Sequence, residues 1–126
     1  PHVGREFFPE AVVDNVAEDR VSVRVAFGMI TCINSGDSLA PESGITVAIR
    51  PEAVGLTRTP SAYSHRCNIE TEAFLGSTVE YTITVGDHSL RVRVPMSAGS
   101  FALGEEVWAN IDPESVMIVG SAQGSV

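Results

Sequence analysis

The stretch Thr78-Val-Glu-Tyr-Thr-Ile-Thr-Val-Gly-Asp-His-Ser-Leu-Arg-Val-Arg-Val-Pro95 carries the clearest structural pattern in the chain of 126 residues. Apolar and polar side chains alternate on both sides of its central Gly-Asp pair, with the period of two that a half-buried β-strand requires. Aligning the apolar faces with Val85 opposite Leu90 predicts a hairpin whose loop is residues 86–89. Pro95 has no N–H to donate, so the second strand is expected to end there.

Alternation of the same kind recurs elsewhere in the chain. It predicts further strands over residues 21–27, 45–49, 69–75, 107–111 and 116–119. No window shows the period of an amphipathic helix, and short alternating runs between glycine turns are typical of β-sandwiches and barrels. The fold class is therefore expected to be all-β.

The pairing register of the strands on either side of Gly76-Ser77 constrains the length of the connection between them. A bare turn at Gly76-Ser77 would put the apolar sets of the two flanking strands on opposite faces, because a slip of one residue inverts every side chain. The sequence therefore predicts either a longer connection over residues 76–78 or a bulge at Gly76. Either solution would place three carboxylates on one outer face: Glu70, Glu72 and Glu80.

The two halves of the chain echo each other. Residues 44–54 and 104–116 each contain a turn glycine, a strand, a Pro-Glu corner and then a valine. Few positions match, so the similarity between the halves could have arisen by duplication or by chance. A duplicated β-unit fits the chain length, because neither half alone would bury an adequate core. We expect a first β-unit over residues 1–56, a linker loop over 57–66, a second β-unit over 67–119 and a flexible tail over 120–126.

The charge balance restricts the possible partners. All 8 basic residues are arginines, and 16 acidic residues bring the net charge to -8. Nucleic-acid binding depends on cations that neutralise phosphates, so no nucleic-acid partner is expected. The chain opens without a basic-then-apolar leader, and no apolar stretch approaches the ~20 residues of a membrane span. A cytoplasmic location is therefore expected.

Catalytic and metal-binding motifs are missing from the sequence. Without lysine the chain cannot form a P-loop, and it contains neither Gly-x-Ser-x-Gly nor His-Glu-x-x-His. His65 and Cys67 could supply two metal ligands, but a closed zinc site needs about four. Cys32 and Cys67 are expected to be reduced thiols, although their spacing does not determine their state. These observations predict a non-enzymatic module without a metal or cofactor of its own.

Two surface features allow more than one interpretation. The expected glutamate face could attract a polyamine or another cation, or it could be a solvated sheet face that keeps the protein soluble. Trp108 is out of phase with the apolar positions of its strand. It would either anchor an interface between domains or subunits or pack between the two β-units.

The run Val47-Ala-Ile-Arg-Pro-Glu-Ala-Val-Gly-Leu56 resembles the hallmark of the TOBE domain, the C-terminal accessory domain of ABC importer ATPases. Within that group it is most similar to the spermidine/putrescine and iron(III) importer branch. The resemblance continues in the order expected for the family, at Phe74-Leu75-Gly76-Ser77, at Gly104-Glu-Glu-Val107 and at the corner Asp112-Pro113.

The resemblance implies a pair of small OB-like barrels on the C-terminal side of an ATPase domain. ATP and magnesium would then bind upstream of this chain, and the module would regulate or support a homodimer in contact with the membrane subunits of an importer. The alternative function is a small-ligand module that binds an oxyanion or a polyamine, with Glu70, Glu72 and Glu80 as weak ligand candidates. The transported substrate is not determined by this sequence.

The corners and turns supply the remaining candidate residues. Arg50 and Glu52 would either reach another domain or pair with neighbours and fix the turn. Gly76 is expected to be structural, because alanine would be strained there if φ is positive. The complete set of interface or structural candidates is Arg50, Pro51, Glu52, Gly76, Ser77, Trp108, Asp112 and Pro113.

Overall fold

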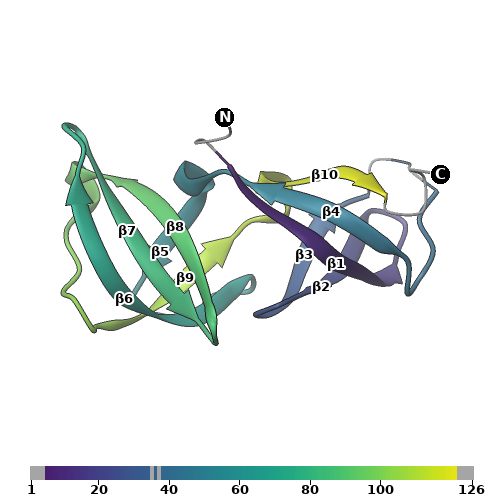
Figure 1. The fold of residues 1–126 in the computed structure, drawn as a ribbon, viewed down its shortest axis with the longest axis horizontal. Helices are drawn as coiled ribbons and strands as arrows, with labels where there is room; N and C mark the ends of the chain where they lie inside the picture. Colours follow the sequence, from purple (N-terminus) through teal and green to yellow (C-terminus); the bar gives the residue numbers. More distant parts are fainter. Residues whose placement is uncertain (1–4, 35, 37, 122–126) are drawn as a thin grey trace.

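The computed structural model describes residues 5–34, 36 and 38–121 (Figure 1). Its elements within these residues are strands and three short 3-10 helices, which confirms the all-β fold class. The strands are β1 (Glu6–Val16), β2 (Arg20–Val25), β3 (Gly28–Ile33), β4 (Gly44–Ile49), β5 (Val54–Thr57), β6 (Ser64–Phe74), β7 (Thr78–Val85), β8 (His88–Pro95), β9 (Glu106–Ile111) and β10 (Val116–Ser121). The 3-10 helices are η1 (Pro51–Ala53), η2 (Met96–Ala98) and η3 (Pro113–Ser115). None of the helices among the described residues could span a lipid bilayer.

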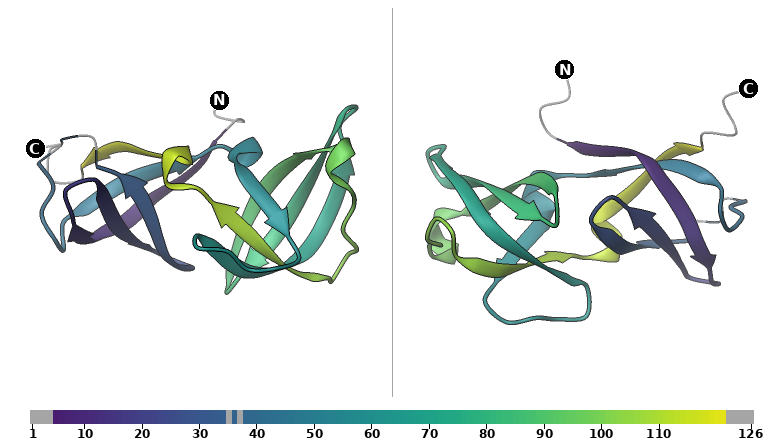
Figure 2. Two further views of the ribbon diagram at one scale, coloured as in Figure 1. Left: turned by 180° about the vertical axis from the view of Figure 1, so that it is seen from behind. Right: turned by 60° about the horizontal axis from the view of Figure 1, so that its bottom comes forward.

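The strands form two curled antiparallel sheets that lie side by side (Figures 1 and 2). The first sheet has the order β10-β4-β1-β2-β3, and the second has the order β5-β9-β6-β7-β8. The two orders correspond position by position, and the longest strand, β1 or β6, occupies the centre of each. This correspondence confirms two related β-units.

Each Pro-Glu corner carries the chain from one sheet to the other. Helix η1 leads from β4 into β5 of the second sheet, and η3 leads from β9 back into β10 of the first. Consequently Val116 pairs with Ile49 and Val54 pairs with Ile111. The expected division into contiguous units, 1–56 and 67–119, is therefore wrong, because each sheet contains one strand from the other range. The physical reason is that the strand after each corner buries its valine against the other half of the chain.

The connecting segments are also shorter than expected. Thr57 ends β5 and Ser64 begins β6, so the connection covers residues 58–63 rather than 57–66. Polar residues at the start of β6 pair with β9, for example Arg66 with Trp108, and such polar positions show no apolar alternation in the sequence. Gly120 and Ser121 belong to β10, whereas residues 122–126 of the expected tail lie outside the described residues.

The hairpin between β7 and β8 is tighter than the sequence predicts. Val85 pairs with His88 and Ile83 pairs with Leu90, so the turn contains only Gly86-Asp87. The predicted partner of Val85 is therefore wrong by two residues, a shift that leaves every side chain on its expected face. Gly86 has a φ of 60°, the positive value that the favoured two-residue hairpin turns require.

A two-residue turn also connects β6 to β7, and the predicted connection over 76–78 is wrong. The Leu75 N–H donates to the Thr78 carbonyl at 2.8 Å, and Gly76 has a φ of 82°. The required one-residue shift occurs instead between Ile69 and Thr71, where the ladder is irregular. A bulge at this place moves the side chains that follow it in β6 to the opposite face of the sheet, so the turn does not have to be longer.

Contacts between side chains hold the two sheets together. The Phe27 ring, in the turn between β2 and β3, lies 5.3 Å from the His65 ring and 5.7 Å from the His88 ring. The Phe8 ring of β1 lies 5.2 Å from the His88 ring. Beside this aromatic cluster, Glu6 of the first sheet and Arg91 of the second form an ion pair at 2.7 Å. Together with the exchanged strands, these contacts connect the sheets on several sides.

Candidate functional site

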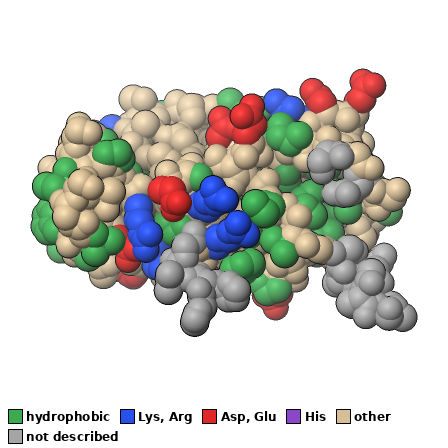
Figure 3. All heavy atoms as spheres, turned by 90° about the horizontal axis from the view of Figure 1, so that it is seen from above, with side chains coloured by type: hydrophobic (Ala, Val, Ile, Leu, Met, Phe, Trp, Pro, Cys, Tyr) green, Lys and Arg blue, Asp and Glu red, His purple; other side chains and the backbone are tan. Residues whose placement is uncertain are grey.

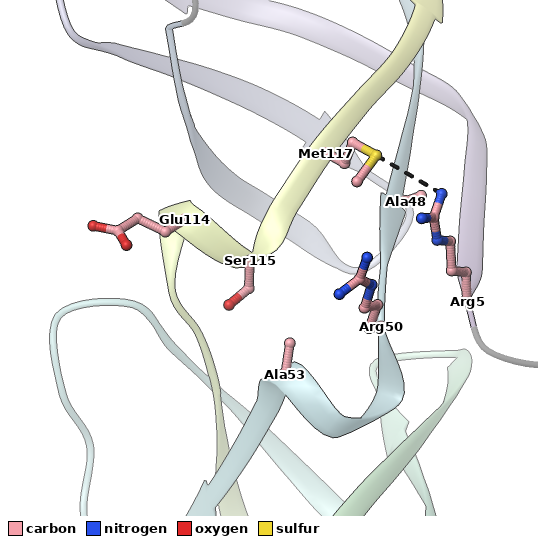
Figure 4. Close-up of a pocket in the computed structure, with 7 residues that line it drawn as sticks. All are labelled: Arg5, Ala48, Arg50, Ala53, Glu114, Ser115 and Met117. Carbon is pink, nitrogen blue, oxygen red and sulfur yellow. Dashed lines mark hydrogen bonds between the residues drawn. The ribbon is translucent and has the colours of Figure 1, made fainter.

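The junction of the two corners contains a pocket of about 250 Å³ (Figure 4). It is formed where the residue before β1, the end of β4, both corner helices and the start of β10 come together. Its walls are made by Arg5, Ala48, Arg50, Ala53, Ser115 and Met117. Glu114 also borders the pocket, and its carboxylate points away from the two guanidinium groups (Figure 4).

The arginines of this pocket differ from the others in the chain. Six arginines have a carboxylate within 4.0 Å: Arg20, Arg24, Arg58, Arg66, Arg91 and Arg93. Arg5 and Arg50 form no ion pair with any residue that the structure describes. Arg5 only donates a weak hydrogen bond from Nη1 to the Sδ of Met117, at 3.8 Å. The positive charge at the pocket therefore has no carboxylate partner among the described residues.

The paired arginines have structural roles instead. Arg24 bridges Asp14 at 2.5 Å and Glu42 at 2.6 Å, and its hydrogen bond lowers the pKa of Glu42. Arg58 pairs with Glu105 at 2.6 Å, which lowers the pKa of that carboxyl. These pairs are mostly exposed and each contributes little stability. The first connects the loop before β4 to β1 and β2, and the second connects the segments that follow β5 and precede β9.

The first corner presents its charged residues to solvent. Pro51 is buried, whereas Arg50 and Glu52 are exposed. Neither charged side chain has a hydrogen bond or ion pair with the residues that the structure describes. The structure thus gives no local pairing that would explain these two residues.

The second corner is held by its own hydrogen bonds. The Oδ1 of Asp112 accepts from the Glu114 N–H at 2.9 Å, and the Asp112 carbonyl accepts from the Ser115 N–H at 2.8 Å. Pro113 is buried at the start of η3. Asp112 therefore caps this turn. Ser115, at the end of the same turn, lines the pocket.

Three other predicted positions lie away from this pocket. Gly76 and Ser77 form the hairpin tip of the second sheet, where the Ser77 carbonyl accepts from the Met96 N–H at 3.0 Å. Trp108 lies in β9 and is half-buried, with the Arg66 guanidinium carbon 5.2 Å from its ring centroid. None of these residues lines the pocket at the corners.

The three glutamates do not form one patch. Glu70 lies at the bulge, and beyond it Glu72 pairs with Tyr81 and therefore shares the face of that buried ring. Glu80 lies on the opposite face and forms an ion pair with Arg93 at 2.9 Å. The expectation of a shared outer face is wrong for Glu72, because the bulge inverts the side chains that follow it.

Sequence reasoning singled out Arg50 but missed Arg5, Ser115 and Met117 as its neighbours. The repeated Pro-Glu corners were the available signal, because they show that residues 51 and 113 occupy equivalent turns. Their proximity depends on the exchange of β5 and β10, which no local pattern reveals. Among the described residues, no group of three or more His, Cys, Asp or Glu is placed to hold a metal ion.

Both cysteines are buried as free thiols, and burial raises the pKa of Cys32 and of Cys67 to about 11. Only the thiolate is a good nucleophile, so we expect neither thiol of the native protein to react with Ellman's reagent at pH 8. In denaturant both should react within minutes. Rapid reaction of either thiol in the native protein would contradict the buried placement.

Stability should depend on His65 in mildly acidic solution. Burial lowers the pKa of His65 below its ordinary value of 6.5, so the unfolded chain takes up this proton more readily than the folded chain. The contribution of His65 is therefore complete above pH 6.5 and is lost as the pH falls below it.

We expect His65→Gln to flatten the pH dependence of the unfolding free energy, measured in urea between pH 5 and 6.5. The two described carboxyls with lowered pKa values, Glu42 and Glu105, lose their contribution mainly below about pH 4.5, and both proteins contain them, so they do not alter the comparison. The slopes above pH 7 serve as the control and should match. Equal slopes in the acidic window would contradict the assignment.

Known proteins resemble this chain in sequence and in fold. The TOBE domain family matches residues 47–119. A curated relative, the spermidine/putrescine import ATP-binding protein PotA 1 of Pseudomonas aeruginosa, is 29% identical over 85 residues, which is 66% of this chain and 23% of the relative. The cytoplasmic molybdate-binding protein ModG, solved with molybdate bound, aligns with a TM-score of 0.69 at 14% identity and covers 91% of this chain and 92% of its own. At that identity the likeness to ModG shows the fold alone.

Proposed function

The chain belongs to the TOBE domain family, and we propose that it is the C-terminal accessory domain of an ATP-binding subunit of a solute-importing ABC transporter. The observation that carries this proposal is the family match over residues 47–119, which includes both Pro-Glu corners. The name of the relative, a spermidine/putrescine import ATP-binding protein, supports the importer class. This chain spans 23% of that relative, so the activity of the whole protein is part of the proposal.

In this role the module is non-catalytic. ATP and magnesium would bind in a separate ATPase domain of the same subunit, at the cytoplasmic face of a bacterial membrane. The imported solute would be a polyamine, iron(III) or a similar small solute. A ligand or protein that contacts the module could change transport only through unequal affinity for the open and closed states of the ATPase dimer.

Two features of the module are consistent with a rigid domain that supports a homodimer. Exchanged strands and the ion pair between Glu6 and Arg91 oppose movement of one sheet against the other. At the far end of the second sheet, Phe74, Leu75 and Met96 are exposed by 65%, 48% and 50%. Figure 3 shows hydrophobic side chains gathered at this end. Exposed apolar side chains in one area favour contact with another protein surface.

The direct test is to identify the native polypeptide that contains this chain. An antibody raised against the module would isolate that polypeptide from the source cells, and mass spectrometry would give its sequence. Peptides with a Walker A loop and an ABC signature would support the proposal. A native polypeptide without an ATPase domain would overturn it.

The homodimer is tested separately by light scattering of the purified chain over a range of concentrations. Self-association at high concentration is expected, and Leu75→Asp should weaken it because the charge would enter the apolar end. Glu52→Gln, a change of an exposed residue at the other end of the sheet, is the matched control. A strictly monomeric chain at every concentration would contradict the dimer.

A second function, a small-ligand module, is favoured by one observation, a pocket lined by Arg5 and Arg50, which form no ion pair with any described residue. This observation favours an anion, since a polyamine would be repelled by Arg5 and Arg50. The three glutamates that could have attracted a polyamine lie apart.

A further inference from the structure

The pocket at the corners holds two positive charges, those of Arg5 and Arg50, that form no ion pair within the described part of the chain. In a chain of net charge -8, carboxylates are abundant, and six arginines use them. Arg5 and Arg50 remain without a carboxylate partner in the described part of the chain, although they line the same pocket. Their charges repel one another, so they contribute nothing favourable to folding through this contact.

Strand register explains why these two arginines lie together. Glu6 of β1 pairs with Ile49 of β4, and continuing this ladder by one residue places Arg5 opposite Arg50. Residues directly opposite in an antiparallel pair project from the same face, and like charges in that arrangement are destabilising. Figure 4 shows both guanidinium groups beside the end of β4, with that of Arg5 hydrogen-bonded to Met117. Two neighbouring cations that have no carboxylate partner among the residues described indicate a place where an anion binds.

The wall of the pocket is partly apolar, which narrows the class of anion. Met117 pairs with Ala48 across β10 and β4, and Ala53 of η1 faces them across the pocket. The pocket has a volume of about 250 Å³, which leaves room for a small organic anion. A tetrahedral oxyanion would leave this apolar wall uncovered, whereas a short carbon chain would pack against it.

We propose that the pocket binds a small dicarboxylate. The forks of Arg5 and Arg50 match the planar geometry of carboxylates, to which a guanidinium donates two parallel hydrogen bonds. The carbon chain lies against Met117, Ala48 and Ala53, and the Ser115 hydroxyl is available as a further donor. This inference rests on the ligand-binding candidate given above, and a negative result would leave the importer assignment untouched.

Glu114 limits the charge that the pocket accepts. Its carboxylate borders the pocket but points away from the arginines, so it opposes entry of larger polyanions without contacting a bound dicarboxylate (Figure 4). Glu114→Gln is therefore expected to tighten binding by a few-fold at low ionic strength, where repulsion between partly exposed charges is least screened.

The test is a calorimetric titration of the chain with succinate at low ionic strength. Butyrate provides the same number of carbons with one carboxylate, and sulfate provides two charges without carbons. We expect succinate to bind at least about tenfold more tightly than either, because only succinate engages both forks and the apolar wall. Saturable binding of sulfate with equal affinity would overturn the dicarboxylate class, and absence of saturable heat from succinate would overturn the site.

Substitutions of the two pocket arginines test whether succinate binds in this pocket. Arg5→Gln and Arg50→Gln should each weaken succinate binding at least about tenfold, and Arg50→Lys should weaken it less because it keeps the charge but loses the fork. Arg20→Gln, which removes an arginine paired with Asp19 at 3.8 Å, is the matched control and should bind as the parent chain does. Thermal melts should show all variants folded, since the pocket arginines repel each other. Unchanged affinity in both pocket variants would overturn the proposal.

Discussion

Removal of residues 116–126 is expected to destabilise the first sheet, although these residues follow the second sheet in the sequence. Strand β10 pairs with β4 through Val116, Met117 and Ile118, and it forms an edge of the first sheet. Its loss removes the backbone hydrogen bonds to β4 and leaves that edge of β4 exposed. With ~1 kcal/mol for each of roughly three hydrogen bonds and ~2 kcal/mol for the buried Val116 side chain, the expected loss is about 5 kcal/mol. That is a large share of the ~5–15 kcal/mol by which domains are stable.

Hydrogen exchange measured by mass spectrometry locates the effect. Amides of β4 and β1 in the shortened chain should exchange much faster, while those of β7 and β8 should change little. The matched control removes only residues 122–126 and keeps β10 intact, so its exchange should equal that of the full chain. Faster exchange confined to the second sheet would show that β10 does not pair with β4.

Ile49→Ala and Ile111→Ala are each expected to lower the free energy of unfolding by about 3 kcal/mol, within the ~2–5 kcal/mol range of buried Ile-to-Ala changes. Ile49 is 0% exposed and Ile111 is 1% exposed, and each ends the strand before a corner. Each isoleucine also pairs with the valine that follows the other corner: Ile49 with Val116, and Ile111 with Val54. Because the two positions are structurally equivalent, the two losses should be similar.

Urea denaturation followed by circular dichroism measures both losses. Ile49→Val and Ile111→Val keep most of each side chain and should lose about 1 kcal/mol. Met117→Ala, at a residue that is 43% exposed, is the surface control and should change stability by less than about 1 kcal/mol. A loss below about 1 kcal/mol for either alanine variant would contradict the equivalence of the two corners.

The parts of the fold that were predictable are those with a local signal. Strands β7, β8 and β9 alternate cleanly because one face is buried and the other is solvated. Strands β1, β3 and β5 were not predicted. β1 contains Pro9 and consecutive apolar residues, and its ladder is irregular between Phe8 and Ala11, so its alternation is interrupted.

The candidate site was predictable only in part. Arg50 stands beside a Pro-Glu corner that the sequence marks clearly, and the echo at Asp112-Pro113 marks its counterpart. The carboxylates Glu70, Glu72 and Glu80 were grouped wrongly, because a bulge has no reliable signature in a single sequence. Arg5 could not be associated with Arg50, because that contact depends on the pairing of β1 with β4.

The amino-acid sequence by itself determined the β character, the two corners, the acidic surface and the family resemblance. These follow from alternation, proline geometry and charge, all of which act within a few residues. Only the tertiary structure decided which sheet receives β5 and β10, where the register slips, and which arginines meet. Those features depend on which distant strands bury their apolar faces together, and the free energy of that burial is shared by residues far apart in the chain.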